Sequence, residues 1–272
     1  MVEVIHTAEA MRAWSQGRQG RIALVPTMGF LHDGHLSLIQ HARSQARHVV
    51  VSIFVNPLQF GPNEDLSRYP RDLQGDLRKL QDVDSVFVPD ALYPAGFDTY
   101  VEPAQLGQHL CGASRPGHFR GVCTVVAMLL RITQCHVAVF GQKDFQQLQI
   151  IKRMVRDLWL DVEIVGMPIV READGLAMSS RNAYLSATQR QDALVLNRAL
   201  RQAKARFEAG ERDAEAILAE VRREIGAVAR LDYAEIVDVE MLQPLRVVDR
   251  PAVCAVAAHV GKTRLIDNVI IT

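Results

Sequence analysis

The chain has 272 residues, of which 49% are apolar and 23% are charged, and its 31 basic side chains balance 31 acidic ones. This length accommodates one large domain or two smaller domains with their own cores, and the composition is ordinary for a soluble globular protein. A net charge of zero disfavours binding to nucleic acid or to a membrane surface, since both are normally met by a basic excess, and no apolar run approaches the length of a transmembrane helix.

Short apolar runs alternate with amphipathic stretches through the first part of the chain. Buried strands are predicted at residues 22–25, 48–55, 85–88, 136–140 and 161–165. Apolar residues at helical spacing predict helices from residue 36 onward and at 66–80, 122–132 and 144–158. Strands that alternate with helices in this way indicate βαβ units. The expected fold class is α/β, with a Rossmann-like doubly wound parallel sheet whose ligands lie beyond the carboxyl ends of its strands.

The character of the sequence changes after about residue 171. A polar loop at 171–181 leads into two charged amphipathic helices, and three short strands follow. The helices are predicted at 187–207 and 214–228, and the strands at 233–239, 252–260 and 263–271. We therefore expect a Rossmann-like ligand-binding domain over residues 1–171 and a smaller α+β domain over residues 172–272, which is a plausible size for an independent domain.

The turn after the first predicted strand is the sharpest signal for function. Residues 25–35 read Val-Pro-Thr-Met-Gly-Phe-Leu-His-Asp-Gly-His and lead into a helix. Free N–H groups at a helix start favour a phosphate, and Gly29 and Gly34 let the backbone approach an anion. His32 and His35 add two imidazole donors, which suggests a nucleoside triphosphate whose phosphates react. Two solvated histidines are the alternative interpretation, and a zinc pair is disfavoured because helical zinc ligands are usually four residues apart.

Two other segments carry groups suited to phosphates. In the loop at 175–182, two serines precede Arg181 and supply hydroxyl donors and a fixed positive charge, although Ser-Ser-Arg is also ordinary loop sequence. In Gly141-Gln-Lys-Asp144, Lys143 could neutralise phosphate charge. Asp144 could accept from a ribose hydroxyl or cap the following helix.

Several further polar residues have both a functional and a plain interpretation. Gln59 and Gln147 carry neutral amide groups, with a donor and an acceptor each, that could orient a hydroxy acid, although a plain surface position is the more common fate of a glutamine. Arg115, His118 and Arg120 form a local basic group that is equally compatible with a solvated loop. The histidines outside these segments are interpreted as structural or surface residues: His6, His41, His48 and His259.

The four cysteines are Cys111, Cys123, Cys135 and Cys254. None forms a Cys-x-x-Cys pair or a zinc-type cluster. We expect a reduced cytoplasmic setting in which these side chains are buried as small hydrophobes, with a secreted disulfide protein as the weaker alternative.

Four segments together resemble the pantothenate synthetase (pantoate–β-alanine ligase) family, at residues 27–35, 54–60, 141–147 and 174–182. Their order and spacing match, and the resemblance extends to the closing Arg264-Leu-Ile-Asp-Asn268. One motif alone would indicate only the wider nucleotidyltransferase superfamily, which shares His-x-Gly-His and a Lys-Met-Ser-Lys-Ser-like loop.

The resemblance implies an ATP-dependent ligase of pantothenate and coenzyme A biosynthesis. It would join pantoate to β-alanine through a pantoyl-adenylate, releasing AMP and pyrophosphate. It also implies Mg²⁺ as cofactor, a cytoplasmic homodimer with no nucleic-acid or membrane partner, and a smaller domain that acts as a lid.

The resemblance also assigns site residues. His35 would be a proton donor, with His32, Lys143 and Arg181 stabilising charge. Pantoate would be held by Gln59 and Gln147, and Gln59 would also lie near β-alanine. The implied ATP-binding residues are Met28, Gly29, Phe30, Leu31, His32, Asp33, Gly34, His35, Gly141, Gln142, Lys143, Asp144, Val170, Met178, Ser179, Ser180 and Arg181.

Asp76 is the predicted metal ligand, although Gly75 precedes it where relatives often carry two adjacent acids. Two other functions stay open on the residues. One is a nucleotidyltransferase that attaches a nucleotide to a phosphate-bearing acceptor and stops. The other is a non-catalytic adenylate sensor or RNA-binding module. AMP release that requires both an acid and an amine would exclude both.

Overall fold

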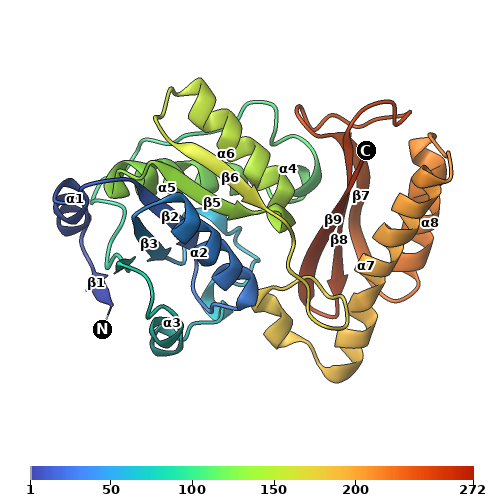
Figure 1. Ribbon diagram of the computed structural model, residues 1–272. Coiled ribbons are helices and arrows are strands. Elements are labelled where there is room, and N and C mark those ends of the chain that lie inside the picture. Colours follow the sequence, from blue (N-terminus) through green and yellow to red (C-terminus); the bar gives the residue numbers. More distant parts are fainter. Residues whose placement is uncertain (1) are drawn as a thin grey trace. The chain divides into compact units, whose positions relative to one another are not determined.

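Figure 1 shows the computed structural model, which describes residues 2–272 and separates into two units. Unit 1 contains the described residues up to Pro103, together with Gly117–Gln142 and Ile150–Pro168. Unit 2 contains Ala104–Pro116, Lys143–Gln149 and Ile169–Thr272. Two segments that precede residue 171 therefore belong to unit 2, and a domain division at residue 171 remains a prediction.

Unit 1 is built on a six-stranded sheet in the order β1-β4-β3-β2-β5-β6, with every pairing parallel. The strands are β1 (Glu3–Ile5), β2 (Ile22–Thr27), β3 (His48–Ile53), β4 (Ser85–Phe87), β5 (Val137–Gly141) and β6 (Glu163–Met167). The chain runs outward from β2 to β3 and then crosses back to β5, so the strand order reverses between β2 and β5. Ligands of doubly wound sheets bind beyond the carboxyl ends at such a switch point. The predicted fold class is confirmed.

The helices of unit 1 cover both faces of this sheet. They are α1 (Ala8–Gln16), α2 (Asp33–Gln45), α3 (Leu73–Lys79) and α5 (His118–Thr133), and α6 (Phe145–Asp157) runs from unit 2 into unit 1. Val25 and Val51 are fully buried in a cluster with Leu38 and Ile39 of α2. Leu24, which alternation places on the opposite face, is equally buried on the side that α5 contacts. Burial on both faces explains why these strands read as continuous apolar runs.

The predicted helix at 66–80 is wrong in its first half. The structure has a short 3₁₀ helix, η2 (Leu66–Arg68), an extended Tyr69 and then α3. Pro70 is the physical reason, because its ring disfavours helical backbone at the preceding residue and it offers no N–H. The strand β1, whose three residues show no periodicity, was not predicted, and neither was the nine-residue helix α1.

Unit 2 is an α+β layer, as the sequence predicts. Its strands β7 (Arg230–Asp238), β8 (Ala252–Val260) and β9 (Thr263–Ile271) pair antiparallel in that order, and its helices are α4 (Leu110–Ser114), α7 (Ala187–Glu208) and α8 (Ala214–Gly226). Figure 1 shows α7 and α8 lying side by side against this sheet. Ser186 caps α7 in a capping box with Gln189, and Asp213 caps α8.

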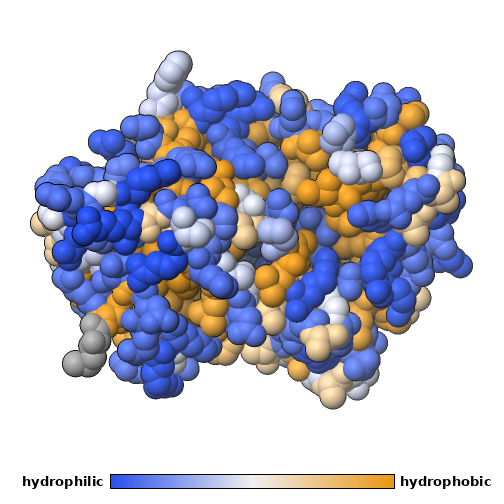
Figure 2. All heavy atoms as spheres, in the orientation of Figure 1, coloured by the Kyte–Doolittle hydropathy of each residue, from blue (hydrophilic) through white to orange (hydrophobic). Residues whose placement is uncertain are grey.

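The core of unit 2 joins these two helices to the sheet. Leu196 and Leu200 of α7, Ile217 of α8 and Val256 of β8 are each at most 2% exposed. On the face shown in Figure 2, hydrophilic side chains cover most of the surface and apolar ones show between them. No helix within residues 2–272 is long and apolar enough to cross a membrane.

Candidate active site

The turn between β2 and α2 adopts a conformation that few residues allow. Gly29 has φ +81° and Phe30 has φ +54°, so two successive residues are left-handed. A Cβ on Gly29 would lie 3.0 Å from both Asp76 Oδ2 and Ile53 Cγ2, so these neighbours would have to give way for a side chain. Left-handed backbone costs a residue such as Phe30 about 1–2 kcal/mol, and it persists only where the surroundings impose it.

Asp76 of α3 imposes this conformation. Its Oδ2 accepts the N–H of Phe30 and its Oδ1 accepts the N–H of Leu31, both at 2.7 Å, and the residue is only 2% exposed. The Lys79 ammonium, one turn later in α3, donates to the carbonyl oxygen of Leu31 at 2.5 Å. Successive backbone N–H groups in such a turn form a concavity that binds anions, and here a buried carboxylate occupies it. Helix α3 therefore fixes the backbone of the turn through Asp76 and Lys79.

The metal role predicted for Asp76 stays a prediction. Each carboxylate oxygen already accepts a backbone N–H, and the side chain faces the turn rather than solvent. Residues 2–272 contain no cluster of three or more His, Cys, Asp or Glu side chains that could hold a metal ion. Mg²⁺ in nucleotide enzymes is held largely by phosphates and water, with one or two carboxylates. The described residues are therefore compatible with Mg²⁺ only if the oxygens of a triphosphate supply most of its ligands.

We expect Asp76→Asn to destabilise the turn, because an amide has one acceptor oxygen whereas two N–H groups each need an acceptor. We also expect it to slow pyrophosphate release from ATP with pantoate, the activity that the resemblance implies, about tenfold or more. Thermal unfolding and a pyrophosphate assay would measure both effects. Asp72→Asn is the matched control, since Asp72 caps the same helix by accepting from Gly75 N at 2.9 Å and does not contact the turn. Unchanged stability with a weakened Mg²⁺ dependence would instead favour the metal role.

His32 and His35 lie together at the start of α2. His32 is the N-cap residue, and the two ring centroids are 4.1 Å apart at an interplanar angle of 35°. The backbone N–H of His32 donates to Nδ1 of His35 at 3.3 Å. A nitrogen that accepts cannot carry a proton, so neutral His35 holds its proton on Nε2. Nε2–H of His35 is therefore a donor group.

Gln59 lies on the next loop of unit 1, in the 3₁₀ helix η1 (Pro57–Gln59) that follows β3. Its Oε1 accepts from Asn56 Nδ2 at 3.0 Å, and its Nε2 lies 3.1 Å from the sulfur of Met28. Asn56 is itself oriented by backbone groups, because its Nδ2 donates to Gly121 O at 3.1 Å and its Oδ1 accepts from Leu58 N at 3.2 Å. The Gln59 amide is thereby fixed with its Oε1 toward Asn56 and its NH₂ group beside Met28.

The surroundings of Gln59 were not predicted from the sequence. Tyr93 OH donates to Asn56 Oδ1 at 2.6 Å, and burial, with a smaller contribution from Tyr100, raises the pKa of Tyr93 so that it stays a donor. His118 Nδ1 donates to the carbonyl oxygen of Gln59 at 2.8 Å. The Asn-Pro pair at the start of η1, a common helix-start pattern, is the one local signal that could have found Asn56.

Two segments that the sequence predicts to bind phosphates belong to unit 2. Lys143 Nζ lies 3.2 Å from Asp144 Oδ2, in the 3₁₀ turn η3 (Gln142–Asp144) that precedes α6. The loop before the turn η4 (Ser180–Tyr184) folds back on itself, since Met178 N donates to Val170 O at 3.0 Å. The structure thus brings the predicted ATP residues Val170 and Met178 together.

Ser179 caps the turn η4 by accepting from Arg181 N at 3.3 Å. Gln147 is half-buried on α6, also in unit 2. In unit 1, the structure gathers the residues from Met28 to His35 beside Gln59, while Gly141 ends β5, which pairs with β2. The predicted residues therefore fall into two ordered groups, one in each unit.

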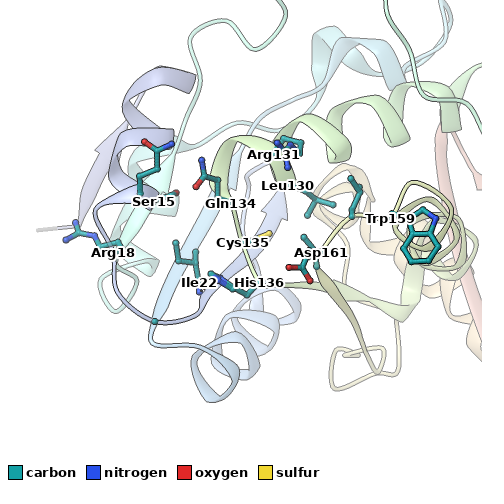
Figure 3. Close-up of a pocket in the computed structure, with 14 residues that line it drawn as sticks. Ser15, Arg18, Ile22, Leu130, Arg131, Gln134, Cys135, His136, Trp159 and Asp161 are labelled. Atoms are coloured by element: carbon teal, nitrogen blue, oxygen red, sulfur yellow. Dashed lines mark hydrogen bonds between the residues drawn. The ribbon is translucent and has the colours of Figure 1, made fainter.

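A cavity of about 730 Å³ in unit 1 lies elsewhere (Figure 3). Ile22, His136 and Val162 line it, and these residues begin or precede β2, β5 and β6. It is therefore at the amino ends of the strands, opposite the turn with the histidines. His136 is oriented there by the Ile22 N–H, which donates to its Nδ1 at 3.1 Å, and Trp159 on its border is 93% exposed.

A doubly wound sheet with a His-x-Gly-His turn at the carboxyl end of β2 is the arrangement that the resemblance to the nucleotidyltransferase superfamily implies. Comparison with known families narrows this class. The family model for pantoate-beta-alanine ligase matches residues 3–270. The chain belongs to the pantoate-β-alanine ligase family.

Relatives and solved structures agree with this membership. The chain is 55% identical to the pantothenate synthetase of Myxococcus xanthus, over 97% of this chain and 94% of that one, and 53% identical to that of Thermotoga petrophila, over 99% and 100%. The crystal structure of pantothenate synthetase from Thermus thermophilus matches with a TM-score of 0.93 and 45% identity, covering 98% of this chain and 99% of that one.

A pantoate-beta-alanine ligase from Francisella tularensis, crystallised with beta-gamma ATP and beta-alanine, matches with a TM-score of 0.83 and 35% identity over 99% of this chain and 98% of that one. The predicted family and the predicted activity, an ATP-dependent ligase that forms pantothenate from pantoate and β-alanine, are confirmed.

Proposed function

We propose that this ligase works through a pantoyl-adenylate intermediate and that the histidine turn stabilises its formation. Direct condensation of a carboxylate with an amine lacks a good leaving group. In the first step a pantoate carboxylate oxygen attacks the α-phosphorus of ATP, and the bond from that phosphorus to the pyrophosphate oxygen breaks. In the second step the β-alanine amine attacks the acyl carbon, the amide bond forms, and AMP leaves with the former carboxylate oxygen.

The orientation of His35 carries this proposal. Its Nδ1 accepts the His32 N–H at 3.3 Å, which assigns the Nε2–H as a donor for oxygens that gain charge as pyrophosphate departs. His32, Lys143 and Arg181 are proposed to stabilise the same charge. The remaining predicted ATP residues of the turn, of Gly141–Asp144 and of the loop from Val170 to Arg181 would line the nucleotide. Mg²⁺ bound to the triphosphate would supply further neutralisation of negative charge.

Gln59 is proposed to bind pantoate through its NH₂ group, with Gln147 as a second amide. The Gln59 NH₂ is a donor because Oε1 is engaged by Asn56 at 3.0 Å, so its natural partners are the hydroxyl or carboxylate oxygens of a hydroxy acid. A pocket that excludes water would protect the mixed anhydride from hydrolysis before the amine arrives.

An isotope experiment tests the intermediate. Pantoate labelled with ¹⁸O in its carboxylate is incubated with ATP, β-alanine and the protein, and each substrate is omitted in turn. We expect pyrophosphate release to require ATP and pantoate alone, AMP release to require β-alanine as well, and one ¹⁸O atom to appear in AMP. Unlabelled AMP would overturn the adenylate, whereas a dinucleotide product or nucleotide binding without turnover would favour the alternative classes.

We also propose a cytoplasmic homodimer in which unit 2 contributes a lid. Support for a reducing compartment comes from the cysteines, all four of which are free and buried. Light scattering at micromolar concentration would test the dimer, since a mass near twice the chain mass of 30.3 kDa is expected.

A further inference from the structure

The closing motif Arg264-Leu-Ile-Asp-Asn268 lies in strand β9, and the proposed function leaves it without a role. Asp267 and Asn268 are adjacent, opposite Val256 and Ala255 of β8, and successive side chains of a strand point to opposite faces. Both are almost completely buried, at 4% and 5% exposure. Buried polar side chains are retained where they are hydrogen-bonded, so the partners of this pair indicate its purpose.

Asp267 anchors the base of the loop that carries Met178–Arg181. Arg171 NH1 donates to Asp267 Oδ2 at 2.7 Å, and its NH2 donates to Oδ1 at 2.9 Å, a bidentate pair that fixes the guanidinium plane. The same NH1 donates to Gly175 O at 3.2 Å, and Arg171 forms a β-bridge with Ala177. The arginine therefore ties both arms of the loop to β9.

Asn268 anchors the other phosphate-directed segment of unit 2. Its Nδ2 donates to the backbone carbonyl oxygen of Lys143 at 2.9 Å. A carbonyl oxygen only accepts, so this contact fixes which way the Asn268 amide faces. It also fixes the backbone from which the Lys143 ammonium extends. The two segments are far apart in sequence, and consecutive residues of one strand hold both.

We propose that Asp267 and Asn268 are positioning residues that hold the loop of Met178–Arg181 and the Lys143 turn in one fixed spacing for the triphosphate. The inference rests on the proposed function, in which both segments contact ATP. Because the two anchors share one strand backbone, neither segment can shift without straining the other. Displacements of about 1 Å in such groups can cost on the order of a hundredfold in rate.

The test compares Asn268→Ala and Asp267→Asn with the wild-type chain. We expect each to raise the KM for ATP about tenfold and to weaken binding of α,β-methylene-ATP, measured by calorimetry, by a similar factor, while the KM for β-alanine changes less than twofold. Thr263→Val is the matched control on the same strand, since Thr263 is also buried, at 7% exposure, and is not part of the anchor. It should leave both ATP constants unchanged.

Different outcomes would overturn the proposed function and the positioning role of Asp267 and Asn268. Wild-type protein that binds the analogue without pantoate-dependent turnover would overturn the proposed function. The calorimetric comparison would then still show whether Asp267 and Asn268 position the groups that bind the analogue. Active variants with wild-type KM and analogue affinity would overturn the anchor. A loss of kcat in proportion to the unfolded fraction, with the KM for ATP unchanged, would show a merely structural role and overturn it equally.

Discussion

Replacement of His35 by alanine is expected to slow pantoate-dependent pyrophosphate release about 10²- to 10³-fold, the usual loss when one donor to a developing charge is removed. The physical reason is the assigned tautomer, in which Nδ1 accepts the His32 N–H and Nε2–H is left as the donor. The measurement is a single-turnover assay with ATP and pantoate, without β-alanine, so that only the first chemical step is observed.

Two amide variants at the same position sharpen this test. In His35→Gln the side-chain NH₂ reaches close to the place of Nε2, so we expect part of the activity to return. In His35→Asn the Oδ1 atom replaces the acceptor Nδ1 and preserves the contact with His32, but no donor replaces Nε2–H. His41→Ala is the control, because His41 lies on the same helix, outside the turn. Equal activity of the Gln and Asn variants would contradict the tautomer assignment.

The second large effect is expected at Gly121. A Cβ at this position would lie 2.2 Å from Leu58 O and 2.6 Å from Gln59 N, so the backbone of η1 would have to move. Overpacking of this kind costs about 1–3 kcal/mol, which corresponds to a fall in melting temperature of roughly 2–12 °C for a chain of this size. The displaced η1 carries Gln59, so we also expect kcat/KM for pantoate to fall about 10- to 100-fold.

Thermal unfolding and steady-state kinetics with varied pantoate would measure both consequences of Gly121→Ala. Gly226→Ala is the matched control, because Gly226 also lies in a helix, α8, and an added Cβ there meets nothing within 4 Å. It should raise stability slightly, by up to about 1 kcal/mol, through the better helix propensity of alanine. A Gly121→Ala protein with wild-type stability and wild-type pantoate kinetics would show that η1 yields freely and does not fix Gln59.

Local patterns were sufficient for most long elements of the fold. The predicted helix at 187–207 is α7 (Ala187–Glu208), and the predicted strand at 48–55 is β3 (His48–Ile53). The segment of α7 shows apolar periodicity and a capping residue, and the segment of β3 is a run of mostly β-branched side chains. Among the elements that were missed or misplaced, β1 is very short and the predicted helix at 66–80 is interrupted at Pro70. Periodicity has no meaning over three residues.

The candidate site divides in the same way. The turn of His32 and His35, the serine loop and Lys143 are visible because each is a contiguous motif with its own chemistry. The partners that orient them are distant in sequence, as Asp76 is from Phe30 and Asn268 is from Lys143. An aspartate or asparagine at such a place carries no local mark of its partner. The metal role of Asp76 was implied by the resemblance and stays a prediction, while only the folded chain shows that its carboxylate accepts two backbone N–H groups.

The amino-acid sequence by itself therefore determined the fold class and the family, and it predicted which groups would bind a triphosphate, since all of these follow from residue types and spacing along the chain. Only the tertiary structure decided how those groups are held. It supplied the carboxylate beneath the turn, the tautomer of His35, the fixed amide of Gln59 and the two anchors of β9. The reason is physical, because a hydrogen bond between distant residues depends on where the fold places both atoms.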